Sequence, residues 1–279
     1  MQNFCTFLKL AGLAVLIVSA FAHGSDARAA AAAAAPFSIS AFGVAMTSCL
    51  LSYDGWVALS FMAGEVKNPK RNLTLASAIG LAAVVGVYVL ANVAYLRVLP
   101  VAQIAATERV GAEVAERTMG SFGAGLVSLT ILISIAGAAN GWAMTAPRIF
   151  FAQARDGLFF GRFASIHPRY QTPGFSILAF GLWCALLALT GTYETLASYA
   201  MFAAWIFYGL TSAGVMVLRR RHPERARPYK MPGYPVTLLL FVAVALGFVV
   251  NTFLATPGPA LVGTLLIAAG VPVYFVWRR

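Results

Sequence analysis

Charged residues are scarce in this chain of 279 residues: they make up 10% of it, whereas hydrophobic residues make up 60%. Soluble domains carry roughly 25% charged residues, so this scarcity excludes an ordinary soluble protein. Residues 231–277 hold no charged residue at all. Apolar residues gathered into blocks of this length are typical of a polytopic membrane protein.

Cysteine and histidine are also rare, with three residues of each. Cys5, Cys49 and Cys184 all fall in apolar runs, and we interpret them as small core residues. The histidines are scattered over loops without the spacing of metal ligands, so no metal site is predicted. The sequence also lacks a Gly-rich phosphate loop and a serine elbow, and its apolar runs hold little acid or base chemistry. We therefore expect no cofactor and no enzymatic activity.

Eight apolar runs are long enough to be membrane helices, since ~20 residues cross a ~30 Å hydrocarbon core. They cover residues 4–22, 37–63, 74–97, 121–146, 174–192, 195–218, 234–254 and 258–277. The Pro-Gly-Pro stretch at residues 257–259 divides the last two runs. Because unpaired backbone finds no solvent in lipid, each run is predicted to be helical.

Basic residues outnumber acidic ones by 20 to 9, which gives a net charge of +11. Most basic residues would share one side of the membrane: Lys67, Lys70, Arg71, Arg148, Arg155, Arg162, Arg169, Arg219, Arg220, Arg221, Arg225, Arg227, Lys230, Arg278 and Arg279. The other side receives Arg28, Arg97, Arg109 and Arg117. Because positive charge holds loops in the cytoplasm, both termini are predicted to be cytoplasmic, in the cell membrane. The basic excess orients the chain in the lipid bilayer and does not indicate a nucleic-acid partner.

The first run has two interpretations. A single lysine, an apolar core and small residues ending in Ala-Arg-Ala are compatible with a signal peptide. The weakly basic start and the helices that follow favour a membrane helix instead. Either interpretation places residues 25–28 outside, and the alanine run at residues 29–35 is interpreted as filler or as an extension of the second helix.

Asp54 and Gly55 interrupt the second apolar run. They lie in the segment SCLLSYDGWVALSFMAGEVKNPKRN, residues 48–72, which extends beyond the end of that run. A charge at a membrane-helix centre costs roughly 2.5–3.5 kcal/mol, and a glycine there adds up to about 1 kcal/mol relative to alanine. One interpretation is a kink, with Asp54 capping a lower half-helix that starts near Gly55. The other is a discontinuous helix whose exposed carbonyl and N–H groups form a binding site. The two are compatible, and we favour the binding site.

Four motifs resemble helices of the amino acid–polyamine–organocation transporters, especially the L-type amino acid transporter branch. The sixth helix of that branch resembles LLSYDGWVALSFMAGEVKNPKRNL, with its Tyr-Asp-Gly-Trp core and Glu-x-x-Asn-Pro-x-Arg-Asn tail. The eighth helix and its cytoplasmic extension resemble NGWAMTAPRIFFAQARDGLFFGRFASIHPRYQTP. The tenth helix and the next loop resemble GTYETLASYAMFAAWIFYGLTSAGVMVLRRRHPERARPYKMPGYP, and the fifth helix resembles NFCTFLKLAGLAVL.

The resemblance implies an all-α integral membrane fold: helices 5–12 of a transporter built from two inverted five-helix repeats. Residues 1–279 would form a single polytopic membrane domain. Within it, residues 1–22 would be helix 5, residues 37–218 the second repeat, and residues 234–277 the last two helices. Helices 1–4 have no counterpart in this sequence.

The resemblance also implies a substrate site at the interrupted helix, made by Leu51, Ser52, Tyr53, Asp54, Gly55 and Trp56. Oriented backbone carbonyls of Leu51, Ser52 and Asp54 would take the α-ammonium group of the substrate. Tyr53 and Trp56 would line or brace the pocket, although packing against neighbouring helices explains Trp56 equally well. Leu51 departs from the family, which often has an aromatic gate at this position.

Lys9 matches a fifth-helix lysine that occupies the space of a sodium ion in proton-coupled or ion-independent relatives. Transport is therefore expected to be coupled to a proton or to no ion. The alternative interpretation of Lys9 is a lysine that extends to the headgroups. Ser134, Asn140 and Thr145 are polar candidates for the inner face of the eighth helix, which hydrogen bonds between helices explain as well. Glu65 is expected to pair with a nearby lysine or arginine.

The expected function is secondary active transport of amino acids across the cytoplasmic membrane. The first family helix, which holds the substrate carboxylate in the family, has no counterpart in this sequence. Three interpretations stay open: a truncated reading frame, a fragment completed by a separate N-terminal half or partner chain, or a decayed gene. The alternative is a non-transporting membrane remnant or scaffold. An intramembrane enzyme is a further alternative, which the lack of a nucleophile–base set disfavours.

Overall fold

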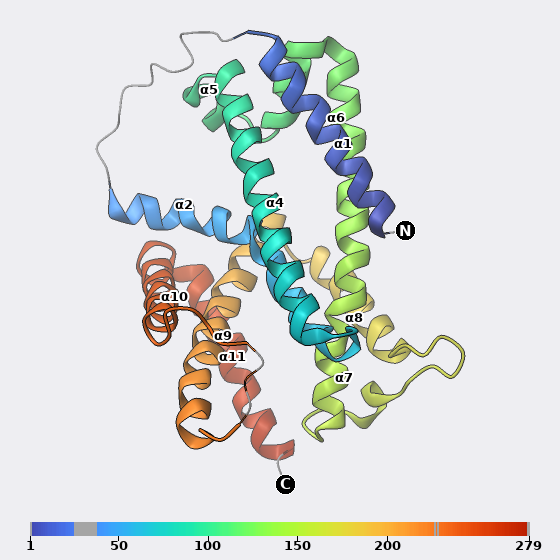
Figure 1. Cartoon of the computed structure of the whole chain (residues 1–279), viewed down its shortest axis with the longest axis vertical. Coiled ribbons are helices and arrows are strands. Elements are labelled where there is room, and N and C mark those ends of the chain that lie inside the picture. Colours follow the sequence, from blue (N-terminus) through green and yellow to red (C-terminus); the bar gives the residue numbers. More distant parts are fainter. Residues whose placement is uncertain (1, 25–37, 226, 228, 278–279) are drawn as a thin grey trace. The chain divides into compact units, whose positions relative to one another are not determined.

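The structure is a computed structural model and describes residues 2–24, 38–225, 227 and 229–277. Within these residues all regular elements are helices (Figure 1). The α-helices are α1 (Gln2–Ala22), α2 (Ile39–Ser52), α3 (Ala58–Phe61), α4 (Pro69–Val98), α5 (Val101–Ala106), α6 (Val110–Thr145), α7 (Pro147–Arg155), α8 (Gly174–Ala188), α9 (Tyr193–Arg221), α10 (Val236–Ala255) and α11 (Pro257–Trp277). The 3₁₀ helices are η1 (Asp54–Val57), η2 (Ala63–Glu65) and η3 (Gly161–Ala164).

Most of the predicted spans are confirmed. Six helical segments of the described residues are long and apolar enough to cross a membrane, and α2 with η1 and α3 makes a seventh as a bent pair. The predicted division at residues 257–259 is confirmed, because α10 ends at Ala255 and α11 begins at Pro257. The chain is a multi-pass membrane protein. The predicted positions of residues 25–28 and of the alanine run lie outside the described residues.

The prediction for residues 174–192 is corrected by the structure. α8 has 15 residues, so it is only about 22 Å long at 1.5 Å per residue, short of the ~30 Å hydrocarbon core. It ends because the N–H groups of Leu189 and Thr190 turn back to the carbonyls of Leu186 and Leu187. The Thr190 hydroxyl also donates to the Leu187 carbonyl at 2.7 Å, which satisfies the helix end.

The chain divides into two compact units. Unit 1 is Met1–Pro36 with Thr74–Thr145, and unit 2 is Phe37–Leu73 with Ala146–Arg279. The single polytopic domain over residues 1–279 stays a prediction.

In unit 1, α1 runs antiparallel to α6 (Figure 1). Three pairs set the register: Gln2 with Asn140, Cys5 with Gly137, and Gly12 with Thr130. Small residues at such contacts let two membrane helices approach closely. This packing supports a membrane helix over a cleaved signal peptide for the first run.

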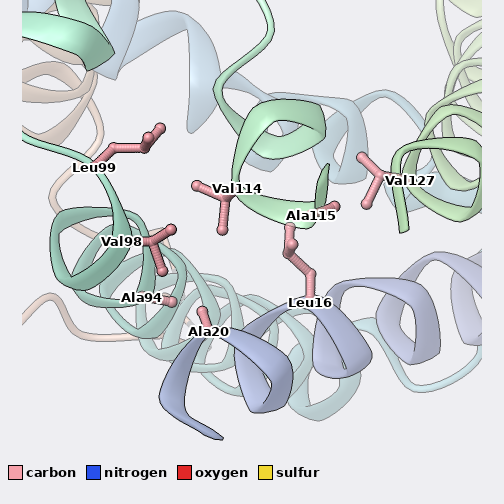
Figure 2. Packing of buried hydrophobic residues seen from close by; sticks show 8 residues of the cluster. All are labelled: Leu16, Ala20, Ala94, Val98, Leu99, Val114, Ala115 and Val127. Atoms are coloured by element: carbon pink, nitrogen blue, oxygen red, sulfur yellow. The ribbon is translucent and has the colours of Figure 1, made fainter. Parts of the chain in front are cut away.

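Buried aliphatic side chains join α1, α4 and α6 into one core (Figure 2). The fully buried members are Leu16, Ala20, Ala94, Leu99, Val114 and Ala115, with Val98 and Val127 nearly so. Cys5 packs against α6 as predicted. Cys49 and Cys184 are exposed on the surfaces of their helices, so the core interpretation is wrong for these two.

Gly120 breaks the regular backbone inside α6. Its φ of 68° and ψ of −161° lie in a region that is essentially restricted to glycine. Two helical segments meet in a kink here, and the long apolar part of α6 starts at the next residue, in agreement with the predicted span 121–146.

Replacing Gly120 with alanine should lower the free energy of unfolding by about 1–3 kcal/mol, because a side chain strains this backbone. The matched control is Gly125→Ala in the same helix, where a Cβ meets no described atom within 4 Å. That control should be neutral or stabilising by up to about 1 kcal/mol. Thermal unfolding in detergent measures both variants, and equal midpoints would contradict the assignment of strain to Gly120.

In unit 2, α9 and α10 pack along each other, and α2 and α11 contact both of them. Their shared core consists of Met201, Trp205, Ala245 and Phe248, with Leu50 and Leu51 of α2 packed against it. A second cluster of phenylalanines joins α7, η3 and α8, and the buried Ser176 hydroxyl donates to the Phe163 carbonyl at 2.9 Å. The α2 side of unit 2 carries the predicted site.

Candidate functional site

The interrupted helix is broken at Tyr53. α2 ends at Ser52, and the chain continues as η1 from Asp54 and then as α3. Tyr53 joins the halves with φ −99° and ψ 2°, and the halves meet at an angle of 46°. The discontinuous helix predicted near residues 53–55 is confirmed.

Serines and a glycine explain the break. The Ser52 hydroxyl donates to the Ser48 carbonyl at 2.8 Å, and the Ser60 hydroxyl donates to the Val57 carbonyl at 2.6 Å. Such back-bonding bends a helix, and Gly55 weakens it further. A Cβ on Gly55 would meet no described atom within 4 Å. The backbone therefore has open space beside it at the break.

Asp54 is tied to α9. Its carboxylate accepts a hydrogen bond of 2.9 Å from the Tyr208 hydroxyl. The predicted capping role of Asp54 is wrong, because Tyr53 takes the cap position of η1 and makes no side-chain cap hydrogen bond. A hydrogen bond to a charged group contributes about 1.5–3 kcal/mol, which offsets much of the roughly 2.5–3.5 kcal/mol cost of an acid inside the membrane.

Aromatic rings hold Tyr208 in place. The Trp56 ring lies 5.3 Å from the Tyr208 ring, and the Trp205 ring lies 5.9 Å from it on the α9 side. Trp205 is itself buried against Phe241 and Phe248. Trp56 is 51% exposed, so it braces Tyr208 while leaving half of its surface toward open space.

The other predicted residues also gather at the break. Leu51 packs against the α9–α10 core, Ser52 is exposed, and Tyr53 is half-buried. The Tyr53 N–H turns to the carbonyls of Cys49 and Leu51. Tyr208 and Trp205 were not predicted from the sequence. The only signal for Tyr208 was a phenol inside a predicted membrane span, and that span holds a second one at Tyr199.

Comparison with known proteins identifies the family. Residues 1–277 match the amino acid permease family. The chain belongs to this family. The permease chain is 32% identical to the human b(0,+)-type amino acid transporter 1, over 99% of its own length and 57% of that relative. It is 33% identical to the serine/threonine exchanger SteT of Bacillus subtilis, over 100% of its own length and 64% of that relative. It is also 28% identical to the human cystine/glutamate transporter, over 99% of its own length and 55% of that relative.

The chain thus resembles transporters over nearly its whole length and belongs to the amino acid permease family, which confirms the resemblance to the amino acid–polyamine–organocation superfamily. It spans 55–64% of the length of these curated relatives. The relatives are named as transporters and not as enzymes.

Lys9 of the permease belongs to unit 1, whereas the break belongs to unit 2. It is half-buried on the stripe of α1 that faces α6, because Gln2, Cys5 and Gly12 of the same stripe contact that helix. The antiparallel register places Lys9 level with the turn of α6 that carries Ser134.

The other polar candidates on α6 make hydrogen bonds within unit 1. The Asn140 amide donates to the Gln2 side-chain carbonyl at 3.1 Å. This is a hydrogen bond between helices, which was one of the two interpretations of Asn140 from the sequence. The Thr145 hydroxyl donates to the Gly141 carbonyl at 3.0 Å in its own helix. Ser134 is half-buried.

Glu65 pairs with an arginine, as predicted. Its carboxylate accepts two hydrogen bonds from the Arg148 guanidinium of α7, at 2.6 and 3.0 Å. These bonds lower the pKa of Glu65 below its ordinary value, against a smaller opposing effect of burial. The ion pair fastens η2, at the end of the broken helix, to α7, within unit 2.

Glu65→Gln should lower the free energy of unfolding by up to about 1 kcal/mol at neutral pH, since the carboxylate is largely exposed. A lowered pKa means that the contribution is fully present above the ordinary value of 4.5 and is lost as pH falls through the lowered pKa. The difference in unfolding midpoint between the wild type and the variant should therefore vanish in acid. Glu116→Gln, which removes an exposed acid, is the matched control and should leave the unfolding midpoint unchanged at neutral pH.

Proposed function

We propose that unit 2 carries one half of an amino-acid binding site and that the permease moves amino acids across the cell membrane. One observation carries this proposal: an α-helix that breaks at Tyr53, beside open space, with a carboxylate held by Tyr208. A break of this kind exposes backbone dipoles that suit a zwitterion without a second full charge in the membrane.

The substrate-binding residues proposed are Leu51, Ser52, Tyr53, Asp54, Gly55 and Trp56. Carbonyls at the break would orient the α-ammonium group. Tyr208 donates to one carboxylate oxygen of Asp54, which leaves its other oxygen for a hydrogen bond to that ammonium. The relatives named above transport amino acids, which supports this substrate class.

Lys9 is proposed to couple transport to a proton. A lysine on the α6-facing stripe of α1, level with Ser134, supplies a positive charge within unit 1 that a coupling cation would otherwise supply. The basic loops further support a cytoplasmic location of both termini in the cell membrane.

A second candidate is a non-transporting remnant or scaffold. The chain spans 55–64% of the length of the three relatives compared above, and both candidates are compatible with this coverage.

Uptake into proteoliposomes that contain only this polypeptide separates the candidates. Labelled L-serine, L-leucine and L-arginine should accumulate above the level of empty vesicles if the chain transports alone. Absence of uptake would remove autonomous transport, and adding four N-terminal helices from a full-length relative would then restore uptake only if the chain is part of a transporter.

A further inference from the structure

Unit 2 contains a cavity away from the Asp54 carboxylate. It has a volume of about 290 Å³ and is lined by residues of α2, α9 and α10. Its polar lining residues are Ser48, Tyr193, Ser198, Asn251, Thr252 and Thr256. At ~30 Å³ per water molecule, the volume corresponds to roughly ten waters. A cavity of this size accepts a small polar molecule.

Asn251 gives the cavity its strongest polar group. It lies in the apolar helix α10, and its side chain makes no hydrogen bond with a residue that the structure describes. An amide without a partner in an apolar setting costs about 1–3 kcal/mol. The amide therefore needs a partner from the cavity, which is a ligand or water.

Gly43 holds this amide in position. A Cβ on Gly43 of α2 would overlap the Asn251 side chain, with the amide carbon only 2.6 Å away and the amide oxygen 2.8 Å away. The amide is therefore lodged against the α2 backbone, between two helices, and cannot turn far from the cavity.

Two threonines complement the amide. The Thr252 hydroxyl donates to the Phe248 carbonyl at 2.9 Å, and the Thr256 hydroxyl donates to the Thr252 carbonyl at 3.0 Å. Both hydroxyl protons are donated to backbone carbonyls of α10. The two hydroxyl oxygens of these cavity-lining threonines are therefore left to act as acceptors. Asn251 adds two N–H donors. Acceptors for an ammonium and donors for a carboxylate therefore stand on one wall.

Apolar side chains make up the rest of the lining. Leu51, Met201 and Phe248 line the cavity and also belong to the packed core of α2, α9 and α10. None of the described lining residues carries a charge. An uncharged lining that combines polar and apolar side chains fits a small neutral amino acid.

We propose that this cavity is a second amino-acid site, separate from the break and joined to it through Leu51. The proposal rests on the proposed function for the identity of the cargo. A molecule held by Asn251 would lie in the cavity lined by Leu51, which is two positions before the break at Tyr53, so it would occupy a waiting position for the same site.

Thiol labelling tests the cavity without requiring transport. In a chain with Cys5, Cys49 and Cys184 replaced by alanine, Ala197→Cys, which lines the cavity from α9 and leaves Asn251 intact, is placed in lipid nanodiscs, where both membrane faces are accessible. A charged methanethiosulfonate reagent should modify it. L-serine or L-leucine at about ten times its dissociation constant should slow the modification roughly tenfold, since only the unliganded fraction reacts.

Matched variants make each outcome decisive. Leu246→Cys, 63% exposed on α10 and absent from the cavity lining, should react slowly and without protection. Val44→Cys repeats the test from the α2 wall if Ala197→Cys fails to fold. Protection that persists with Asp54→Ala supports a separate site even where uptake fails. If Asp54→Ala abolishes the protection, the ligand binds at the break and not in the cavity, and the proposal fails. The proposal also fails if neither cavity cysteine is modified or if the ligand protects neither of them. None of these results contradicts the proposed function.

Discussion

Replacing Asp54 with alanine is expected to weaken amino-acid binding by tenfold or more. The carboxylate lies at the break, and loss of a hydrogen bond to a charged group costs about 1.5–3 kcal/mol, where each 1.4 kcal/mol is about tenfold in affinity. Equilibrium binding of labelled L-serine and L-leucine to the chain in nanodiscs measures the change. Wild-type affinity in Asp54→Ala would remove the reason for placing the site at the break.

Tyr208 should act through Asp54 and not on the substrate directly. Tyr208→Phe keeps the ring between Trp56 and Trp205 but removes the hydroxyl that donates to Asp54. We expect a loss of affinity worth about 0.5–1.5 kcal/mol, and no further loss when Tyr208→Phe is added to Asp54→Ala. Additive losses in this double-mutant cycle would show that Tyr208 has an independent role.

A second tyrosine of α9 provides the control. Tyr199 lies on the same helix, and its hydroxyl makes no hydrogen bond with a residue that the structure describes. Tyr199→Phe should therefore leave affinity unchanged. If it weakens binding as much as Tyr208→Phe does, the effect belongs to α9 as a whole and not to the contact with Asp54.

Much of the fold follows from the sequence because lipid allows few backbone structures. Apolar runs without charge become helices, and the division at residues 257–259 and the start of the long apolar helix after Gly120 were both predictable from local residues. The prediction of a membrane-spanning helix at residues 174–192 was wrong for a local reason. Apolar residues continue through Leu189, but Thr190 and Gly191 favour a helix end. Composition measures apolar length, whereas hydrogen bonds at the helix end decide where the helix stops.

The site was less predictable than the fold. Asp54 and Gly55 mark the break in the sequence, because both are costly in a membrane helix. The partner of Asp54 was not predictable, since Tyr208 follows it by 154 positions and only the packing of α2 on α9 brings them together. For the same reason the sequence suggested a cap for Asp54, which is a local hydrogen bond, and missed the tertiary one. Asn251 was overlooked because its role depends on the approach of α2 at Gly43.

Lys9→Gln should abolish the dependence of uptake on a proton gradient. Lys9 lies on the α6-facing stripe of α1, level with Ser134, and glutamine is polar at this position but cannot carry or exchange the charge. In proteoliposomes that transport, an inward proton gradient should accelerate wild-type uptake, whereas the variant should show the same rate with and without the gradient.

The expected loss of proton dependence is specific to the position of Lys9 and does not apply to every lysine of the chain. Lys67→Gln removes an exposed lysine after the broken helix and should leave the proton dependence intact. Lys9→Arg keeps a positive charge that does not deprotonate in proteins, so it should preserve binding but lose the response to the gradient. Two results would contradict proton coupling by Lys9: wild-type uptake that requires sodium, or uptake by the Lys9→Gln variant that still responds to the proton gradient. Either result would indicate that Lys9 packs α1 against α6 and does not couple transport.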